Sequence, residues 1–479
     1  MDKKLITNYL YNILYQLIKI ILPIVIVPYT MGHLGASVLG ISDFAGNIAS
    51  WFILFGVLGV NLYGNREIAK VRDDSQELSK TFFEILAMQV INMGIACLLF
   101  IIYVFLFVKE NQTIYYLYVF TILASMFDIT WFYYGVEDFK LASIRNILVK
   151  ILGVACIMIF VKSPNDLWKY VVINSFSEIF GQIIMFAELK KYIKPIKFNI
   201  LEGYKKHIHQ TIILFIPTIA ISVYTLLDQT MLGFLTDDTS NVALYKASQG
   251  FVKMFLYFIT SIGSVMLPRI TNIFYNKGGQ KEATRYINIT IKIAMLLAIP
   301  MMAGMIAVSP YFIPWYLPQQ PEIIGLIQIS SPIVVMISLS NVFGIQYLVP
   351  TGRNKEYTRS VVYGATANFM ANLFLIPKFG GIGAALGSVI AETIVTAVQY
   401  YYVHDELKIH WNSSYIKYFI GAAIMYPGVI YIGNLLGPSI LTNLIQALFG
   451  LAIYGLALLV TREELTIKIF NKVLRRNDG

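Results

Sequence analysis

Residues 10–31 read LYNILYQLIKIILPIVIVPYTM, an apolar run that holds one charged side chain, Lys19. A helix needs about 20 mostly apolar residues to cross the hydrocarbon core of a bilayer. The run therefore predicts a transmembrane helix. Because no small-residue cleavage site follows a short apolar core, we expect a retained span and not a cleaved signal peptide.

Apolar runs of similar length recur along the rest of the chain. They cover residues 38–62, 81–107, 114–134, 142–161, 167–187, 211–232, 242–266, 286–308, 323–348, 358–375, 383–403, 415–435 and 441–460. Together with residues 10–31 they predict an all-α polytopic membrane protein of about fourteen spans, which use roughly 280 positions. The composition agrees, because 57% of the 479 residues are hydrophobic and only 13% are charged. A soluble chain this apolar could not cover its own surface.

The formal charge of +10 has its cause in the loops between these runs. With the N-terminus inside, the outer loops hold only Lys109, Lys162 and Lys378, and the other loops hold most of the remaining Lys and Arg. Loops kept in the cytoplasm carry an excess of these residues. We therefore expect both termini in the cytoplasm, the bilayer as the chain's surroundings, and no nucleic-acid partner.

A lysine-rich stretch separates two sets of six predicted spans. The predicted domains are an N-terminal six-helix bundle at 1–189, a basic cytoplasmic linker at 190–210, a C-terminal six-helix bundle at 211–403, and helices 13 and 14 with a basic cytoplasmic tail at 404–479. A weak internal repeat supports the division, because Arg66 and Arg269 close the second span of each half at an offset of 203 positions. Parallel repeats of this kind are typical of transporters and predict a cleft between two bundles.

Three lysines are candidates for substrate binding in that cleft. Lys19 lies near the middle of the first span. Pro23 has no N–H to donate to the Lys19 carbonyl, so a positive charge and a free hydrogen-bond acceptor lie at the same depth in the bilayer. Lys246 and Lys253 are seven residues apart, which puts both on one face of a helix. The alternatives are that Lys19 snorkels or pairs structurally, and that Lys246 belongs to the outer interface.

Two acids, Asp43 and Asp228, fall at comparable outer depth in their spans. A carboxylate in a bilayer is costly, so each is a candidate for coupling to a proton or cation, and structural pairing with a lysine is the alternative. Cys97 and Cys156 stand far apart with no CxxC or Cys/His cluster, so we expect no metal and no cofactor. No outer loop is long enough for a catalytic domain, and we therefore expect no catalytic residues and no enzyme.

Short patches along the chain resemble bacterial polysaccharide and O-antigen flippases of the Wzx type. The patches are NYLYN at 8–12, Pro28-Tyr29, Leu39-Gly40-Ile41, YGNREIAKVRD at 63–73, Leu78-Ser79-Lys80, Tyr134-Gly135 with Glu137, Phe139 and Lys140, residues 217–233 around Asp228, Pro268-Arg269, and GGIGAA at 380–385. The resemblance implies the multidrug/oligosaccharidyl-lipid/polysaccharide transporter superfamily. Its members have two six-helix bundles facing a cleft lined by helices 1, 2, 7 and 8, and they work by alternating access.

From these residues and this resemblance we expect a transporter in the bacterial cytoplasmic membrane. It would flip undecaprenyl-pyrophosphate-linked oligosaccharide repeat units for cell-surface polysaccharide biosynthesis, that is, capsule or exopolysaccharide export. Its partners would be the lipid-linked oligosaccharide, the bilayer, and polysaccharide polymerase and export components. Two alternatives remain open, a cation-coupled multidrug antiporter of the same superfamily and a membrane polymerase or ligase acting on lipid-linked glycans.

Overall fold

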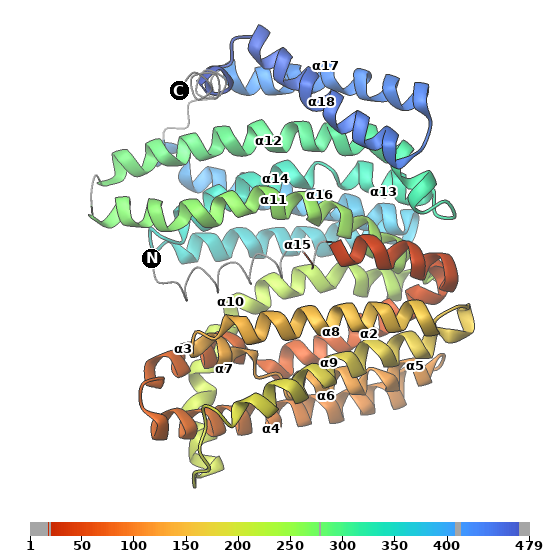
Figure 1. The fold of residues 1–479 in the computed structure, drawn as a ribbon. Coiled ribbons are helices and arrows are strands. Elements are labelled where there is room, and N and C mark those ends of the chain that lie inside the picture. Colours follow the sequence, from red (N-terminus) through yellow and green to blue (C-terminus); the bar gives the residue numbers. More distant parts are fainter. Residues whose placement is uncertain (1–17, 19–20, 277–278, 408–412, 469–479) are drawn as a thin grey trace. The chain divides into compact units, whose positions relative to one another are not determined.

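The computed structural model describes residues 18, 21–276, 279–407 and 413–468, and over these ranges the chain forms helices and no strands (Figure 1). Eleven helical segments of the described chain are long and apolar enough to cross a bilayer, and a shorter apolar helix covers Ile21–Leu34. The prediction of an all-α polytopic membrane protein is thus confirmed. The number of about fourteen spans and the arrangement as two six-helix bundles stay predictions.

The described chain divides into two compact units, residues 1–243 and 244–479. The first contains α2 (Ala36–Val57), α3 (Val60–Val71), α4 (Ser75–Phe107), α5 (Gln112–Leu117), α6 (Val119–Met126), α7 (Thr130–Gly135), α8 (Phe139–Phe160), the short helix η1 (Pro164–Asp166), α9 (Leu167–Leu189) and α10 (Ile200–Leu235). Because α10 begins at Ile200, its first turns fall within the predicted linker at 190–210. The predicted domain boundaries stay a prediction.

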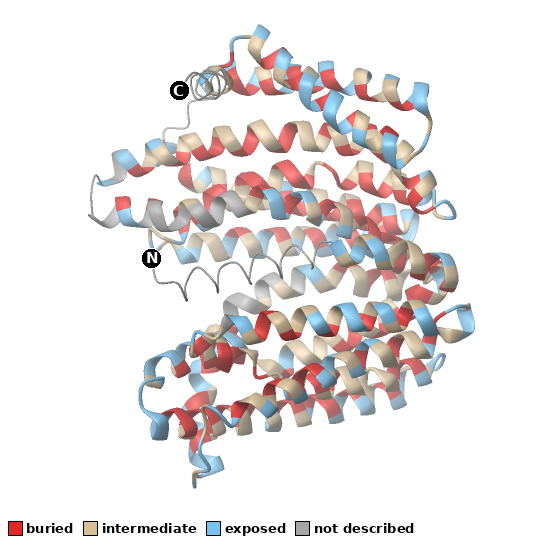
Figure 2. Cartoon of the chain, in the orientation of Figure 1, coloured by how far each residue is buried: buried red, intermediate tan, exposed pale blue. Residues whose placement is uncertain are grey.

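The helices of the first unit pack around a cluster of buried aromatic side chains. Phe82, Trp131, Phe132 and Tyr133 are at most 1% exposed and lie at the junction of α4, α7 and the start of α8. Large apolar side chains such as Phe105 are instead exposed along the outer faces of the helices. Figure 2 shows that exposed positions recur along the helices. Apolar residues on the outside are expected where lipid tails are the solvent.

One sharp bend separates α2 from α3. Leu58 and Gly59 have φ angles of 47° and 80°, in the left-handed region. A Cβ on Gly59 would lie 3.2 Å from the backbone nitrogen of Phe215 in α10. Glycine therefore serves both the backbone conformation and the close approach of α10.

The second unit contains α11 (Ser240–Asn276), α12 (Gly279–Tyr316), α13 (Glu322–Ser330), α14 (Ile333–Ser340), the π-helix η2 (Asn341–Leu348), α15 (Asn354–Phe379), α16 (Gly381–Leu407), α17 (Ser413–Leu436) and α18 (Ile440–Val460). Helices α15 and α16 form a tight hairpin at Gly380, and a Cβ on Gly383 would lie 2.3 Å from the carbonyl oxygen of Leu375. Helices α17 and α18 pair with each other and pack on α12. The positive φ of 54° at Gly380 and the π-helix η2 lie on either side of α15.

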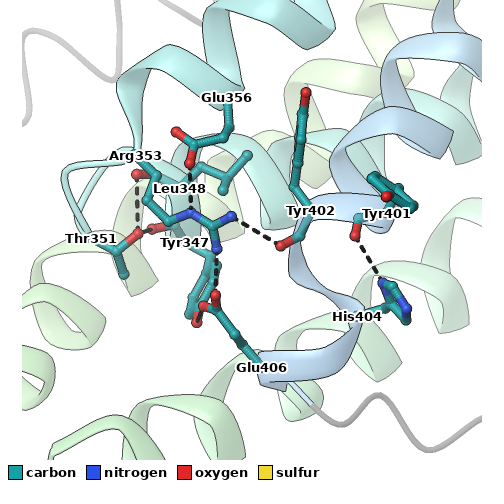
Figure 3. A network of polar contacts seen from close by, with 9 residues as sticks. All are labelled: Tyr347, Leu348, Thr351, Arg353, Glu356, Tyr401, Tyr402, His404 and Glu406. Carbon is teal, nitrogen blue, oxygen red and sulfur yellow. Dashed lines mark hydrogen bonds and ion pairs between the residues drawn. The ribbon is translucent and has the colours of Figure 1, made fainter.

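A polar network fixes the chain where η2 passes into α15 (Figure 3). The guanidinium of Arg353 donates to the Glu356 carboxylate at 3.2 Å, to the Glu406 carboxylate at 2.8 Å and to the carbonyl of Tyr402 at 3.1 Å. The hydroxyl of Tyr347 donates to Glu406 at 2.6 Å. Because Tyr347 belongs to η2 and Glu406 to α16, the network ties the end of the π-helix to the end of α16.

Candidate functional site

The structure places four of the five predicted site residues. Asp43 is half-buried on α2 and Asp228 is 5% exposed on α10, both in the first unit. Lys246 and Lys253 are exposed on α11, in the second unit. Lys19 lies outside the described residues. The two acids therefore stand on helices that pack against each other, whereas both described lysines share one helix of the other unit.

Polar side chains join α2 to α10 near the two acids. The Asn47 amide donates to the carbonyl of Leu226 at 3.1 Å and accepts from the Thr230 hydroxyl at 3.0 Å. The Trp51 indole N–H donates to the Thr230 hydroxyl at 2.7 Å. These contacts connect residues about 180 positions apart in the sequence, and we call Asn47, Trp51 and Thr230 the polar seam.

The polar seam adds neutral polar groups to an apolar helix pair. Asp43, Asn47 and Trp51 follow each other at spacings of four, which places them along one face of α2. Asp228 lies two residues from Thr230, and both belong to the segment of α10 that contacts α2. Polar groups at membrane depth are costly unless they are satisfied or face a cavity, so this face is the best candidate for a functional surface in the first unit.

The sequence interpretation missed the three residues of the polar seam. The available signal was the spacing of Asn47 and Trp51 behind Asp43, which predicts a common face of the helix. The partner residue Thr230 has no comparable signal, because its role depends on the packing of α10 against α2.

An apolar groove lies next to the polar seam. It has a volume of about 530 Å³ and is lined by Ile48, Trp51, Phe52, Phe55, Asn92, Ile95, Ala96, Leu99, Tyr103 and Phe234. Several of these side chains, including Phe55, Leu99 and Phe234, are about half exposed or more. Trp51 both lines the groove and donates to the polar seam. Pockets of this size hold small organic ligands, and a lining rich in aromatic side chains suits an apolar ligand.

A second buried polar cluster anchors the other end of α10. His207 is 1% exposed, and its Nε2 donates to the Glu84 carboxylate at 2.9 Å because a carboxylate only accepts. The neutral ring then accepts at Nδ1 from the Tyr63 hydroxyl at 2.6 Å. The Lys206 ammonium also contacts Glu84, at 2.8 Å. His207 and Asp228 are 21 residues apart, about 30 Å along a helix, so the cluster is separate from the polar seam.

The described part of the chain contains no group of three or more His, Cys, Asp and Glu side chains that could hold a metal ion. What it contains is a set of long apolar helices, with polar contacts buried between α2 and α10 and an aromatic groove beside them. These features define the class of the protein: it is a polytopic integral membrane protein with polar side-chain contacts between its helices.

The chain belongs to the polysaccharide biosynthesis protein family, whose profile matches residues 5–274. A second profile, MatE, matches residues 214–377. The resemblance to the Wzx-type flippases and their transporter superfamily is thereby confirmed.

Several relatives and solved structures align with most of the chain. An Escherichia coli K12 protein named "Putative O-antigen transporter" is 24% identical over 406 residues, which are 83% of this chain and 96% of that protein. The solved structure of the lipid II flippase MurJ in an inward closed conformation aligns with a TM-score of 0.71 at 16% identity, over 96% of this chain and 99% of that one. An inward-facing MATE multidrug transporter aligns with a TM-score of 0.59 at 12% identity, over 81% and 98%. At these identities the structural likeness concerns the fold alone.

Proposed function

We propose that the protein is a flippase that moves undecaprenyl-pyrophosphate-linked oligosaccharide across the bacterial cytoplasmic membrane by alternating access, for capsule or exopolysaccharide biosynthesis. The observation that carries the proposal is the aromatic groove beside the polar seam, with Trp51 shared by both. A lipid-linked oligosaccharide has an apolar chain and a polar head, so its carrier needs an apolar surface next to a polar one. Such transport requires no covalent chemistry.

The lysines supply the charge that the pyrophosphate requires. Lys246 and Lys253 are exposed on α11 and lie two helical turns apart, so their ammonium groups share one face. An ammonium group acts on phosphate oxygens as a compact point charge. We assign pyrophosphate binding to these two residues and, on its sequence position, to Lys19. Asp43 and Asp228 are then the candidates for ion coupling or for pairing with the lysines.

The relatives support the proposed flippase function. The Escherichia coli protein, 96% of whose length this chain covers, carries the name "Putative O-antigen transporter", and the family profile is that of a polysaccharide biosynthesis protein. We also propose that both termini lie in the cytoplasm, because this orientation puts most of the Lys and Arg residues of the loops on the cytoplasmic side. Polysaccharide polymerase and export components are the proposed protein partners.

The direct test is transport by the purified protein in proteoliposomes. We expect labelled undecaprenyl-pyrophosphate-linked oligosaccharide to become accessible at the opposite leaflet much faster than in protein-free liposomes. Equal rates with and without protein would contradict the proposal.

A cation-coupled multidrug antiporter is the second candidate, and two observations favour it. Asp228 is buried in a helix of the first unit, and the MatE profile matches residues 214–377. The same vesicles distinguish the two functions. Drug efflux driven by a proton or sodium gradient, without movement of the lipid-linked glycan, would select the antiporter.

Filling the aromatic groove should slow transport. Leu99 lines the groove and Leu98, its neighbour on α4, does not, although both are more than half exposed. We expect Leu99→Trp to lower the flipping rate about tenfold, equivalent to about 1.4 kcal/mol, because the indole occupies the space of the lipid chain. Leu98→Trp is the matched control and should transport at the wild-type rate. Equal rates for the two variants would remove the groove from the mechanism.

A further inference from the structure

A small cavity in the second unit is separate from every residue used above. It lies among α11, α12 and the passage from α14 to η2, and it is lined by Ile259, Thr260, Thr290, Ala294, Ser338, Asn341, Val342 and Gln346. Its volume is about 10 Å³, which is room for one occupant of the size of a water molecule.

The hydroxyl groups that line this cavity have already used their hydrogens. Thr260 donates to the carbonyl of Leu256 at 2.9 Å, and Thr290 donates to that of Tyr286 at 3.0 Å. Ser338 donates to the carbonyl of Val334 at 2.6 Å. Since a hydroxyl has one hydrogen and two lone pairs, these three groups have only acceptor capacity left for an occupant.

Gln346 adds a fourth acceptor, and it is an oxygen without a hydrogen-bond partner. Its side chain is 1% exposed, and its Oε1 is buried and unpaired while its Nε2 donates to Asn341 Oδ1 at 3.1 Å. An unsatisfied buried oxygen costs free energy and calls for an explanation. An occupant of the cavity that bears positive charge or donates hydrogens would provide one.

The π-helix is what brings Asn341 and Gln346 together. Residues five apart point about 140° away from each other on an ideal α-helix, so their side chains do not meet. In η2 the backbone bonds run from residue i to i+5, as from Val349 N to the carbonyl of Gly344 at 3.0 Å, and the two amides become neighbours. Single π-helical turns inside α-helices are frequent at functional sites.

We propose that this cavity is a binding site for one dehydrated monovalent cation of the size of Na⁺. A water molecule donates two hydrogens and so serves at most two of these acceptors, whereas a cation can take lone pairs from more than two of them at once. Oxygen atoms are the ligands that hard cations prefer. None of the residues lining the cavity carries a charge, so a monovalent ion leaves less uncompensated charge in this low-dielectric setting than a divalent ion would. The site goes beyond the proposed transport of a lipid-linked glycan, and its test requires no transport.

The experiment measures ²²Na⁺ binding to the purified full-length protein in detergent. We expect saturable binding that excess NaCl displaces and N-methyl-D-glucamine chloride does not. Thr290→Val removes one oxygen at constant shape, and Gln346→Met removes the unpaired one, so each should raise the Kd at least about tenfold. The matched control is Thr366→Val on α15, because Thr366 is exposed and makes the same bond to its own helix, to the carbonyl of Val362 at 2.9 Å.

Gel filtration and a melting curve without Na⁺ show whether each variant is folded. If Gln346→Met is not folded, Thr290→Val alone tests the proposal. Wild-type protein without saturable binding would mean that the cavity holds a water molecule, which overturns the proposal. Unchanged affinity in Thr290→Val, with binding lost in Asp228→Asn, would place the cation elsewhere and overturn it equally. None of these outcomes depends on whether the protein flips a glycan.

Discussion

A variant with Lys19→Ala, Lys246→Ala and Lys253→Ala together is expected to lose polysaccharide export. Hydrogen bonds to charged groups contribute about 1.5–3 kcal/mol each. Loss of two or more such contacts to the pyrophosphate should therefore lower the transport rate at subsaturating substrate by at least about 100-fold. The measurement is surface polysaccharide in cells that depend on this protein, together with glycan flipping in proteoliposomes.

The control for this variant removes the same amount of charge elsewhere. Lys109, Lys190 and Lys355 are exposed, and their replacement by alanine should leave export unchanged. Arginine at positions 19, 246 and 253 keeps the charge and should retain part of the activity. Normal export by the triple alanine variant at wild-type amounts in the membrane would contradict the proposed pyrophosphate site.

Most of the helices could be predicted from the sequence because the bilayer restricts the choice so strongly. Residues 441–460 were predicted as a span, and α18 covers Ile440–Val460. Residues 167–187 were predicted in the same way, and α9 covers Leu167–Leu189. An apolar run of this length must satisfy its backbone hydrogen bonds internally, and a helix does so.

The interruptions within spans could not be predicted in this way. The apolar run at 114–134 is divided into α5, α6 and α7, and a buried glutamine of α4 compensates the break between α6 and α7. Gln89 donates to the carbonyls of Ser125, Met126 and Asp128 at 3.0–3.2 Å. The partner that makes the break tolerable comes from another helix, so the run itself carries no sign of it. The same holds for η2, whose end is held by Arg353 and Glu406.

The candidate site was predictable only one residue at a time. Asp43 and Asp228 stand out in the sequence because ionisable residues are rare in spans, and the structure puts them on contacting helices. The polar seam and the cation cavity consist of neutral Asn, Gln, Ser and Thr, which are common in spans. Only the packing of several helices gives such residues a shared role.

The largest effect on stability is expected from Glu84→Ala. Glu84 is 4% exposed and accepts hydrogen bonds from both His207 and Lys206, so it fixes the start of α10 to α4. Removing the acceptor leaves the buried N–H of the neutral His207 ring without a partner, which typically costs about 1–3 kcal/mol. We therefore expect the free energy of unfolding of the purified protein in detergent to fall by about this amount, which for 479 residues lowers the melting temperature by roughly 1–3 °C.

Two comparisons separate this effect from a general loss of charge. Glu188→Ala breaks an exposed ion pair with Lys191, whose side chain is 70% exposed, and should change stability by less than about 1 kcal/mol. Lys206→Ala removes the exposed partner of Glu84 but leaves the bond from His207 Nε2 in place, so its effect should be similarly small. Glu84→Ala and His207→Ala remove the same hydrogen bond. The loss of unfolding free energy in the double variant should therefore be smaller than the sum of the losses in the two single variants. An unfolding free energy of Glu84→Ala less than about 1 kcal/mol below that of the wild type would mean that contacts other than this bond hold α10 in place.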